Sequence, residues 1–205
     1  MTLIRMSSIK LLRSFMLSDS NITPYDSSNT RGVKVKIERV WAMPSAWTFS
    51  IKPIANLLKE EMGDGLFVKG VWCDPFAGKY SQAQIRNDFN GKHEFCMDAI
   101  EFLKSRKDNE FDGVLLDPPY SLRQISEHYK KQGKKITGWH TSAGWQSKLK
   151  KHAARILKPG GKAICFGWNS MGLGKTRGFE MRRILIVPHG GSKNDTICTV
   201  EIKNP

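Results

Sequence analysis

The residues whose types point most clearly to a chemical role are Asp117, Pro118 and Tyr120, in the stretch FDGVLLDPPY at residues 111–120. The Asp117 carboxylate and the Pro118 carbonyl are hydrogen-bond acceptors, and neither proline has an N–H that would compete for them. Pro119 holds Pro118 in an extended conformation, and Tyr120 adds a flat aromatic face. Two acceptors beside a stacking surface suit the exocyclic amine of a nucleobase. The simpler interpretation is a strand end capped by an Asp-Pro-Pro turn.

A nucleobase amine is a poor nucleophile because its lone pair is conjugated into the ring. If Asp117 and Pro118 accept its two N–H bonds, the nitrogen can pyramidalise and direct the lone pair at an electrophile. This stabilisation grows as positive charge develops on the nitrogen, so it favours the transition state over the ground state. Tyr120 would stack on a base swung out of its helix.

Two motifs in the chain resemble those of one enzyme family. Residues 117–120 resemble the D-P-P-Y motif of the DNA amino-methyltransferases, which methylate the exocyclic amine of adenine (N6) or cytosine (N4). About forty residues earlier, D-P-F-A-G at 74–78 resembles the S-adenosylmethionine-binding motif of the same family. The resemblance covers residues 37–202. It implies an α/β, Rossmann-like class I methyltransferase fold with a mostly parallel sheet and a C-terminal antiparallel hairpin. It also implies that the catalytic residues are Asp117, Pro118, Pro119 and Tyr120.

The same resemblance implies S-adenosylmethionine as the cofactor and suggests where it binds. Residues 49–53 resemble the family segment that packs over the methionine end of the cofactor, although the plain start of an amphipathic helix also fits them. In the D-P-F-A-G turn Gly78 can adopt a positive φ, and we expect it to let the ligand approach the backbone. The cofactor-binding candidates are Phe49, Ser50, Ile51, Lys52, Asp74, Pro75, Phe76, Ala77, Gly78, Asp88 and Asp98.

Two of these acids are candidates for the adenosine part of the cofactor. Asp88 ends a short predicted strand, where an acid often binds the ribose hydroxyls. Only nine residues separate Gly78 from Asp88, so the crossover between the two strands must be shortened. Asp98 is a natural N-cap for a helix over 97–103. In the family an acid at this place often accepts from the adenine amine, and one residue can do both.

Periodicity and turn residues predict alternating strands and helices, which indicates an α/β fold. Strands are expected over 33–37, 68–73, 84–88, 114–116, 162–168, 184–187 and 196–202, and helices over 54–62, 97–103 and 142–157. The last two strands form the hairpin, and residues 168–174 are a glycine-rich loop that lines the base pocket or only connects two elements. Asp74, Asp88 and Asp117 all end predicted strands, at the edge where open α/β sheets bind ligands.

Charge indicates a polyanionic partner. The 205 residues include 33 Lys and Arg against 19 Asp and Glu, a net charge of +14. Residues 121–160 alone contain ten basic residues and a single acid, Glu127. We expect this region to bind nucleic acid, because no room remains for a separate target-recognition domain. The candidates are Arg123, Lys130, Lys131, Lys134, Lys135, Trp139 and Trp145. The alternative is that the tryptophans pack into the core and the lysines only solvate the surface.

The chain divides into a basic N-terminal extension (1–33) and a single catalytic domain (34–205). The extension has no acid before Asp19. It is compatible with an organellar presequence, with a disordered basic arm, or with a translation start assigned too far upstream. The compact domain looks like the small stand-alone enzymes of phages and mobile elements, which predicts the cytoplasm of a bacterial or phage-infected cell. Four cysteines without a C-x-x-C pair indicate free thiols in a reducing compartment. No metal-ligand spacing and no membrane-spanning stretch is found, and the oligomeric state is open.

These observations predict methyl transfer from S-adenosylmethionine to the exocyclic amine of a nucleobase in DNA. Adenine N6 is preferred over cytosine N4, because Asp at the first motif position is more usual for the family's adenine enzymes and Ser for its cytosine enzymes. Two alternatives stay open. One is an RNA base-amine methyltransferase, since ribosomal RNA enzymes use related turns. The other is a catalytically idle nucleic-acid-binding module.

Overall fold

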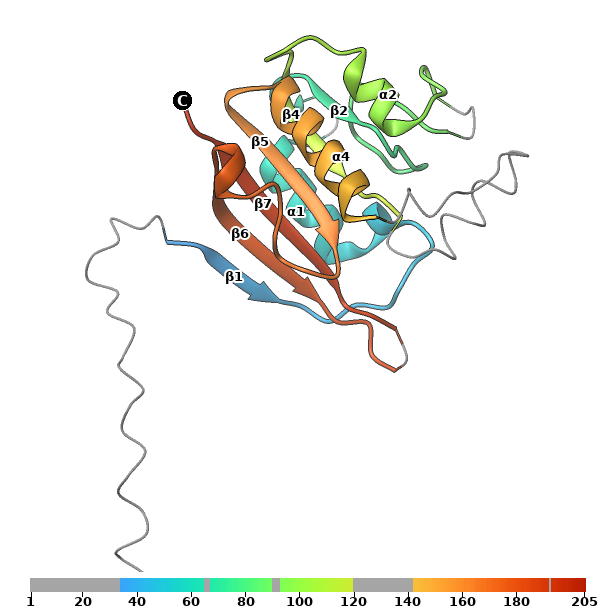
Figure 1. Ribbon diagram of the computed structural model, residues 1–205. Helices are drawn as coiled ribbons and strands as arrows, with labels where there is room; N and C mark the ends of the chain where they lie inside the picture. The colour runs from blue at the N-terminus through green and yellow to red at the C-terminus, as the bar shows by residue number, and fades with distance from the viewer. Residues whose placement is uncertain (1–33, 65–66, 90–92, 120–141, 192) are drawn as a thin grey trace, which may run out of the picture. The chain divides into compact units, whose positions relative to one another are not determined.

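The computed structural model describes residues 34–64, 67–89, 93–119, 142–191 and 193–205. Within these residues one seven-stranded sheet has the order β1-β6-β7-β5-β4-β2-β3 (Figure 1). Its strands are β1 (Lys36–Arg39), β2 (Trp72–Asp74), β3 (Ile85–Arg86), β4 (Phe111–Leu116), β5 (Leu157–Gly167), β6 (Phe179–Val187) and β7 (Thr196–Lys203).

All the strands except β7 point in the same direction. The pairs β1–β6, β2–β3, β2–β4 and β4–β5 are parallel, whereas β7 is antiparallel to both β5 and β6. The expected mostly parallel sheet with a C-terminal antiparallel hairpin is thereby confirmed. The hairpin is not the edge of the sheet, however, because β1 pairs with β6 on its outer side.

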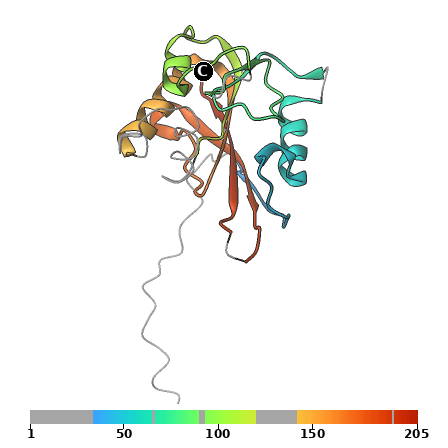
Figure 2. The same cartoon turned by 90° about the vertical axis from the view of Figure 1, so that its right-hand side faces the viewer.

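Helices pack on both faces of the sheet (Figure 2). On one face α1 (Lys52–Met62) packs against Leu115 and Ile164. On the other face α2 (Ala99–Lys104) and α4 (Ala143–Ile156) pack against Val114 and Leu116. Because successive residues of β4 point to opposite faces, this strand needs apolar side chains at every position from 114 to 116. That requirement explains the uninterrupted Val-Leu-Leu run.

Local sequence explains the helix boundaries. Pro53 stands in the first turn of α1, where its missing N–H costs nothing, and the buried residues of this helix have the predicted spacing: Ile54, Leu57, Leu58 and Met62. Asp98 caps α2 as expected, since its carboxylate accepts from the backbone N–H of Ile100 at 2.8 Å. Ser142 caps α4 through the N–H of Trp145 at 3.1 Å. Two short 3-10 helices, η2 (Thr48–Ser50) and η5 (Lys175–Arg177), complete the elements of the described residues.

The start of β5 differs from the prediction. Lys158-Pro159-Gly160-Gly161 was expected to separate helix from strand, but β5 begins at Leu157, directly after α4. Phe111 pairs with Leu157, and the register then shifts so that Gly113 pairs with Lys162. Gly160, at φ +77°, accommodates the shift. The glycines therefore form an irregularity inside the strand.

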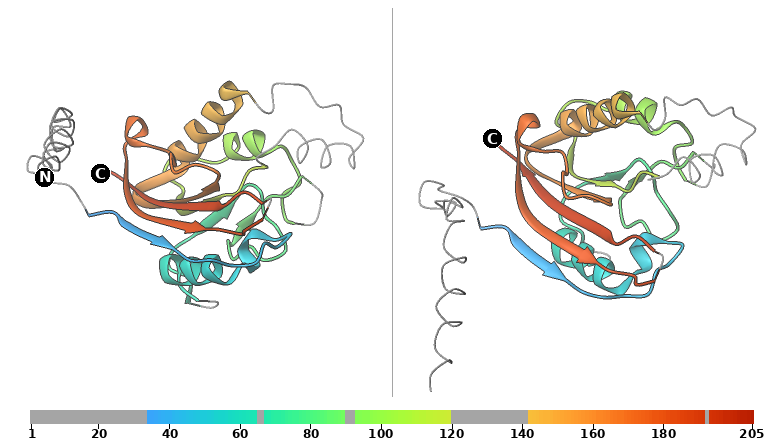
Figure 3. Two further views of the ribbon diagram at one scale, coloured as in Figure 1. Left: turned by 90° about the horizontal axis from the view of Figure 1, so that it is seen from below. Right: turned by 60° about the horizontal axis from the view of Figure 1, so that its bottom comes forward.

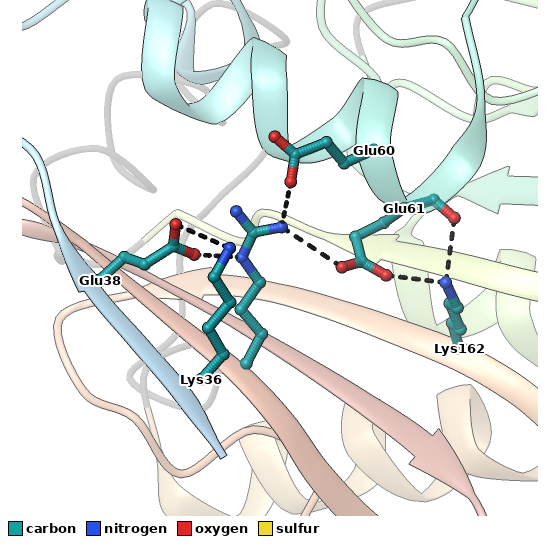
Figure 4. Close-up of polar contacts among 6 residues, drawn as sticks. Lys36, Glu38, Glu60, Glu61 and Lys162 are labelled. Atoms are coloured by element: carbon teal, nitrogen blue, oxygen red, sulfur yellow. Dashed lines mark hydrogen bonds and ion pairs between the residues drawn. The ribbon is translucent and has the colours of Figure 1, made fainter. Parts of the chain in front are cut away.

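Arg183 in β6 is the centre of a charged cluster that joins β1, α1 and β6 (Figure 4). Its side chain is only 10% exposed, and its guanidinium donates to Glu38 in β1 at 2.5 Å and to Glu60 in α1 at 2.6 Å. Glu61 lies 3.5 Å from the same guanidinium and also pairs with Lys162 of β5 at 2.7 Å. The cluster fastens the outer strand β1 and the helix α1 to the sheet.

We expect Arg183→Met to lower the free energy of unfolding by about 2–3 kcal/mol, because it leaves two partly buried carboxylates, Glu38 and Glu61, close to the more exposed Glu60 without their shared cation. The free energy of unfolding of Arg183→Lys should lie between those of the parent and Arg183→Met, because an ammonium keeps the charge but cannot bridge several carboxylates as the guanidinium fork does. Denaturant titration measures both. The matched control is Arg182→Met, whose more exposed pair with Glu180 should contribute less than about 1 kcal/mol. Equal losses in Arg183→Met and Arg182→Met would contradict this role.

Candidate functional site

The candidate site lies at the carboxyl edge of the parallel strands, where Asp74 ends β2 and Asp117 follows β4. Asp74 is fully buried. Its pKa is raised to about 7: burial raises it most, hydrogen bonds from Ser81 and Phe76 lower it, and the charges of Asp117 and Asp88 raise it. Because β3, β2 and β4 are adjacent parallel strands, Asp88, Asp74 and Asp117 lie at or just after strand ends on the same edge of the sheet.

Asp74 shapes the loop that follows β2. One carboxylate oxygen accepts from the Phe76 N–H at 2.9 Å and the other accepts from the Ser81 hydroxyl at 2.7 Å. Pro75 and Ala77 are buried, whereas Phe76 is half-buried and edge-on to Trp145, with ring centroids 6.3 Å apart. Both Asp74 oxygens thus have hydrogen-bond partners inside the protein, and the loop presents Phe76 at its surface; the contact of Asp74 with the cofactor stays a prediction.

Asn87 holds the shortened crossover together. Its amide donates to the carbonyls of Pro75 and Met97, both at 3.0 Å, and its side-chain oxygen accepts from the Met97 N–H at 3.1 Å. The backbone adds bonds from Ala77 N to Asn87 O and from Asn87 N to Asp74 O. A buried asparagine thus takes over the stabilisation that a crossover helix would supply. The sequence gives it no signal beyond the shortness of the segment.

Gly78 does not adopt a positive φ. Two atoms of the Trp47 ring lie 3.2 and 3.4 Å from the position that a Cβ would occupy on Gly78. A side chain there would require the indole to shift by a few tenths of an ångström, so glycine allows the close approach of Trp47. This partner comes from a segment far away in sequence, which no local pattern indicates.

The segment before α1 meets this loop through Trp47. Phe49 in η2 is buried and packs on Phe166 of β5, with ring centroids 4.9 Å apart, and Ile51 is buried as well. Ser50 and Lys52 are exposed, and the Ser50 hydroxyl donates to the Trp47 carbonyl at 2.8 Å. The two segments that resemble cofactor-binding motifs are therefore side by side.

The remaining acids are half-buried. Asp88 follows β3, and its backbone N–H donates to the Phe95 carbonyl at 3.1 Å. Asp98 uses its carboxylate as the cap of α2. Both lie in the connection between the carboxyl end of β3 and α2.

The D-P-P part of the motif follows β4 directly. Asp117 and Pro119 are half-buried and Pro118 is buried. Tyr120 lies outside the described residues, and so do the proposed nucleic-acid contacts Arg123, Lys130, Lys131, Lys134, Lys135 and Trp139.

Trp145 corrects the predicted nucleic-acid surface. Only 4% of its surface is exposed, and it belongs to the core cluster of α4 together with Leu149 and Ala153. The spacing of four residues between these side chains places them on one helix face. Trp145 is therefore a core residue that packs edge-on to Phe76, as the alternative interpretation of the tryptophans has it, and offers no exposed face to a base.

Glu201 is a further residue that the sequence prediction missed. It is buried in β7, and its carboxylate accepts from the N–H groups of Leu173 at 2.5 Å and Gly174 at 3.0 Å. A side chain on Gly172 would collide with this carboxylate. The glycine-rich loop after β5 is thus anchored to the sheet. The sequence did contain a signal for this role, because Glu201 is an acid within the mostly apolar strand β7.

Comparisons with known proteins give the fold. No family model matches the chain, and no curated protein sequence matches it. Among solved structures, the 1,6-didemethyltoxoflavin-N1-methyltransferase of Burkholderia thailandensis is similar over 75% of this chain and 78% of that one, with 12% identity and a TM-score of 0.50. TrmN from Thermus thermophilus is similar over 75% of this chain and 49% of its own, with 18% identity and a TM-score of 0.46.

A putative DNA modification methylase, also from Thermus thermophilus, aligns over 53% of this chain and 52% of its own, with 17% identity and a TM-score of 0.35. The chain thus spans about half the length of the two Thermus proteins. The likeness to the Burkholderia enzyme confirms a Rossmann-like, class I methyltransferase fold. No described helix is long and apolar enough to cross a membrane, and the described residues contain no cluster of three His, Cys, Asp or Glu placed to hold a metal ion.

The raised pKa of Asp74 predicts a pH-dependent stability. Between pH 3.8, the ordinary pKa of an aspartate, and about pH 7, the folded protein binds this proton more tightly than the unfolded chain does. The free energy of unfolding therefore falls as the pH rises through this range. Asp74→Asn cannot titrate, yet it can still accept from Phe76 and donate to Ser81. We expect the unfolding free energy of Asp74→Asn, relative to the parent, to rise by up to about 1.4 kcal/mol per pH unit in this window.

Denaturant titrations at several pH values measure this difference. Asp64→Asn, at an exposed acid paired with Lys59, is the matched control and should show no comparable rise. Parallel stability curves for Asp74→Asn and the parent would contradict the buried, proton-holding carboxylate.

Proposed function

We propose that this chain is an S-adenosylmethionine-dependent methyltransferase that acts on the exocyclic amine of a nucleobase in DNA, with adenine N6 as the target. The observation that carries the proposal is the position of Asp117-Pro118-Pro119 at the end of β4, in the same neighbourhood as the loop after β2. An amine-binding turn and a ligand-binding loop at one sheet edge are what such a transfer needs. The fold supports this, since the Burkholderia methyltransferase is described with bound S-adenosylhomocysteine.

The residues present fit this cofactor. Phe76 and Gly78 are half-buried in the loop after β2, and Asp88 and Asp98 are half-buried carboxylates in the connections that follow it. With the Asp74 oxygens used inside the protein, the binding of ribose hydroxyls falls to Asp88. When bound, S-adenosylmethionine supplies an electrophilic methyl group. The chain would orient that group toward the turn after β4, through the loop and through the segment of Phe49.

Asp117 and Pro118 act on the amine. The Asp117 carboxylate and the Pro118 carbonyl each accept one N–H bond, which leaves the nitrogen lone pair free for the methyl carbon. Both contacts strengthen as the nitrogen becomes positive, so they lower the barrier. The surplus proton then leaves to water or through Asp117. Tyr120, next in sequence, is the stacking partner for the base.

Three of the four cysteines are poorly suited to covalent catalysis, whereas the fourth, Cys96, is exposed. Cys73, Cys165 and Cys198 lie in β2, β5 and β7, and burial raises the pKa of all three thiols, for Cys165 to about 12. At neutral pH these thiols hold their protons and are weak nucleophiles. Methylation of a ring carbon through a cysteine adduct would need the opposite environment.

Asp117→Ala should abolish methyl transfer while S-adenosylmethionine binding stays within a few-fold of the parent, because Asp117 faces the amine and not the cofactor. Asp88→Ala is the paired variant, and we expect it to weaken cofactor binding instead. Calorimetric titration with the cofactor, beside a turnover assay on DNA, measures both. Substantial turnover by Asp117→Ala would refute the mechanism.

The methylated position is the second test. Nucleoside digestion and mass spectrometry of treated DNA should find N6-methyladenine as the main product and N4-methylcytosine as the minor one, if any. DNA incubated with Asp117→Ala is the control for contaminating activity. Methylation of a ring carbon would overturn the amine-activation chemistry.

A further inference from the structure

Residues 40–47, which we call the edge segment, join β1 to η2 and expose large apolar side chains. Trp41 is 61% exposed, Met43 68% and Trp47 44%. Figure 3 shows this part of the chain running from the end of β1 to η2 and α1. Val40 is 44% exposed as well. Single exposed apolar residues are ordinary on protein surfaces, but four in one short connection call for an explanation.

The edge segment crosses the carboxyl edge of the sheet. At its start it continues along β6, with bonds from Val40 N to Ile186 O and from Ala42 N to Pro188 O. The Trp41 indole nitrogen lies 3.6 Å from the Cβ position of Gly190, in the connection between β6 and β7. At its far end Trp47 lies against Gly78, in the loop after β2. The segment therefore extends from one side of the candidate site to the other.

The backbone of this segment is held in place. Its Ala42 carbonyl is hydrogen-bonded to His189 Nδ1 at 2.9 Å, and His189 Nε2 is 2.9 Å from the Thr196 hydroxyl. Near the other end, the Ser45 hydroxyl accepts from the Trp47 N–H at 3.1 Å. Fixed backbone contacts leave the aromatic side chains exposed in defined places. Such pre-organisation favours ligand binding, because little entropy is lost on contact.

Two more exposed aromatic residues lie at the same edge. Tyr80, 45% exposed, is edge-on to Trp47 with ring centroids 6.3 Å apart, and the Lys79 ammonium lies 5.3 Å from its ring. Trp168, 47% exposed, follows β5 two residues after Phe166, which packs on Phe49 of η2. We call Trp41, Trp47, Tyr80 and Trp168 the aromatic rim.

Positive charge accompanies the aromatic rim. Four exposed basic residues lie at the end of β1, at the start of α1 and in the connections after β2 and β6, and none of the four forms an ion pair with another described residue: Arg39, Lys52, Lys79 and Lys193. Flat aromatic faces interleaved with cations suit a polynucleotide strand, whose bases stack while its phosphates pair with the cations. An apolar protein partner would not need the cations.

We propose that the aromatic rim binds the unpaired bases of a single nucleic-acid strand, so that the protein prefers single-stranded over duplex nucleic acid. This proposal rests on the proposed function, because it supplies the strand that leads to the turn after β4. A duplex keeps its bases stacked inside and offers the rim only its backbone. On this proposal the aromatic rim is the binding surface, and single-stranded nucleic acid is the class of substrate.

The test is fluorescence anisotropy with one labelled DNA oligonucleotide, single-stranded or annealed to its complement. The parent should bind the single strand several-fold more tightly than the duplex. Trp41→Ala should weaken single-strand binding about fivefold or more, whereas Trp41→Phe should keep most of it, because a smaller aromatic face still stacks. Phe67→Ala, which removes another exposed aromatic side chain in the connection before β2, is the matched control and should bind as the parent does.

Equal affinity of the parent for the two DNA forms, or single-strand binding by Trp41→Ala within twofold of the parent, would overturn the proposal. So would self-association that Trp41→Ala abolishes without changing DNA affinity. Methyl transfer assayed in parallel separates the two proposals. Transfer by the parent together with unchanged binding by Trp41→Ala refutes the rim alone. Absent transfer together with Trp41-dependent binding supports the rim and refutes the proposed function.

Discussion

The burial of the Asp74 carboxylate is the constraint on which the ligand edge depends. A carboxylate without exposure is unfavourable unless hydrogen bonds compensate it, and the compensating donors here are the Phe76 N–H and the Ser81 hydroxyl. To supply them, the chain must turn back on itself after β2, which leaves Phe76 half-buried at the edge and Gly78 against Trp47. The turn also brings Asn87 close enough to hold the shortened crossover. One buried acid thus determines the shape of the loop that the proposed cofactor needs.

A second group of interactions decides what surrounds that edge. The Arg183 cluster holds β1 and α1 to the sheet, and the connection between these two elements is the edge segment. A contact network on one side of the molecule therefore positions aromatic side chains beside the candidate site. Glu201 does the same for the loop after β5. The polar contacts that stabilise the fold thus also fix the connections that carry the proposed binding surfaces.

Local patterns were sufficient to predict much of this arrangement. The apolar run of β4, the apolar face of α1 and the cap at Asp98 follow from short-range rules, and the three acids at one edge follow from strand direction. What failed depends on partners distant in sequence. Gly78 lies against Trp47, and Trp145 is edge-on to Phe76, and each pair joins segments far apart in the sequence. The pairing of β1 with β6 and the role of Glu201 likewise join segments whose proximity no local pattern encodes.

The central claim, methyl transfer to a nucleobase amine, is tested most directly by offering tritiated S-adenosylmethionine together with single-stranded DNA, duplex DNA and RNA in parallel. The account predicts stable tritium incorporation into DNA, highest in the single strand, and released as a methylated amine base on digestion. Cofactor binding without incorporation into any of the three nucleic acids would contradict it. Incorporation into RNA alone would show that RNA, and not DNA, is the substrate.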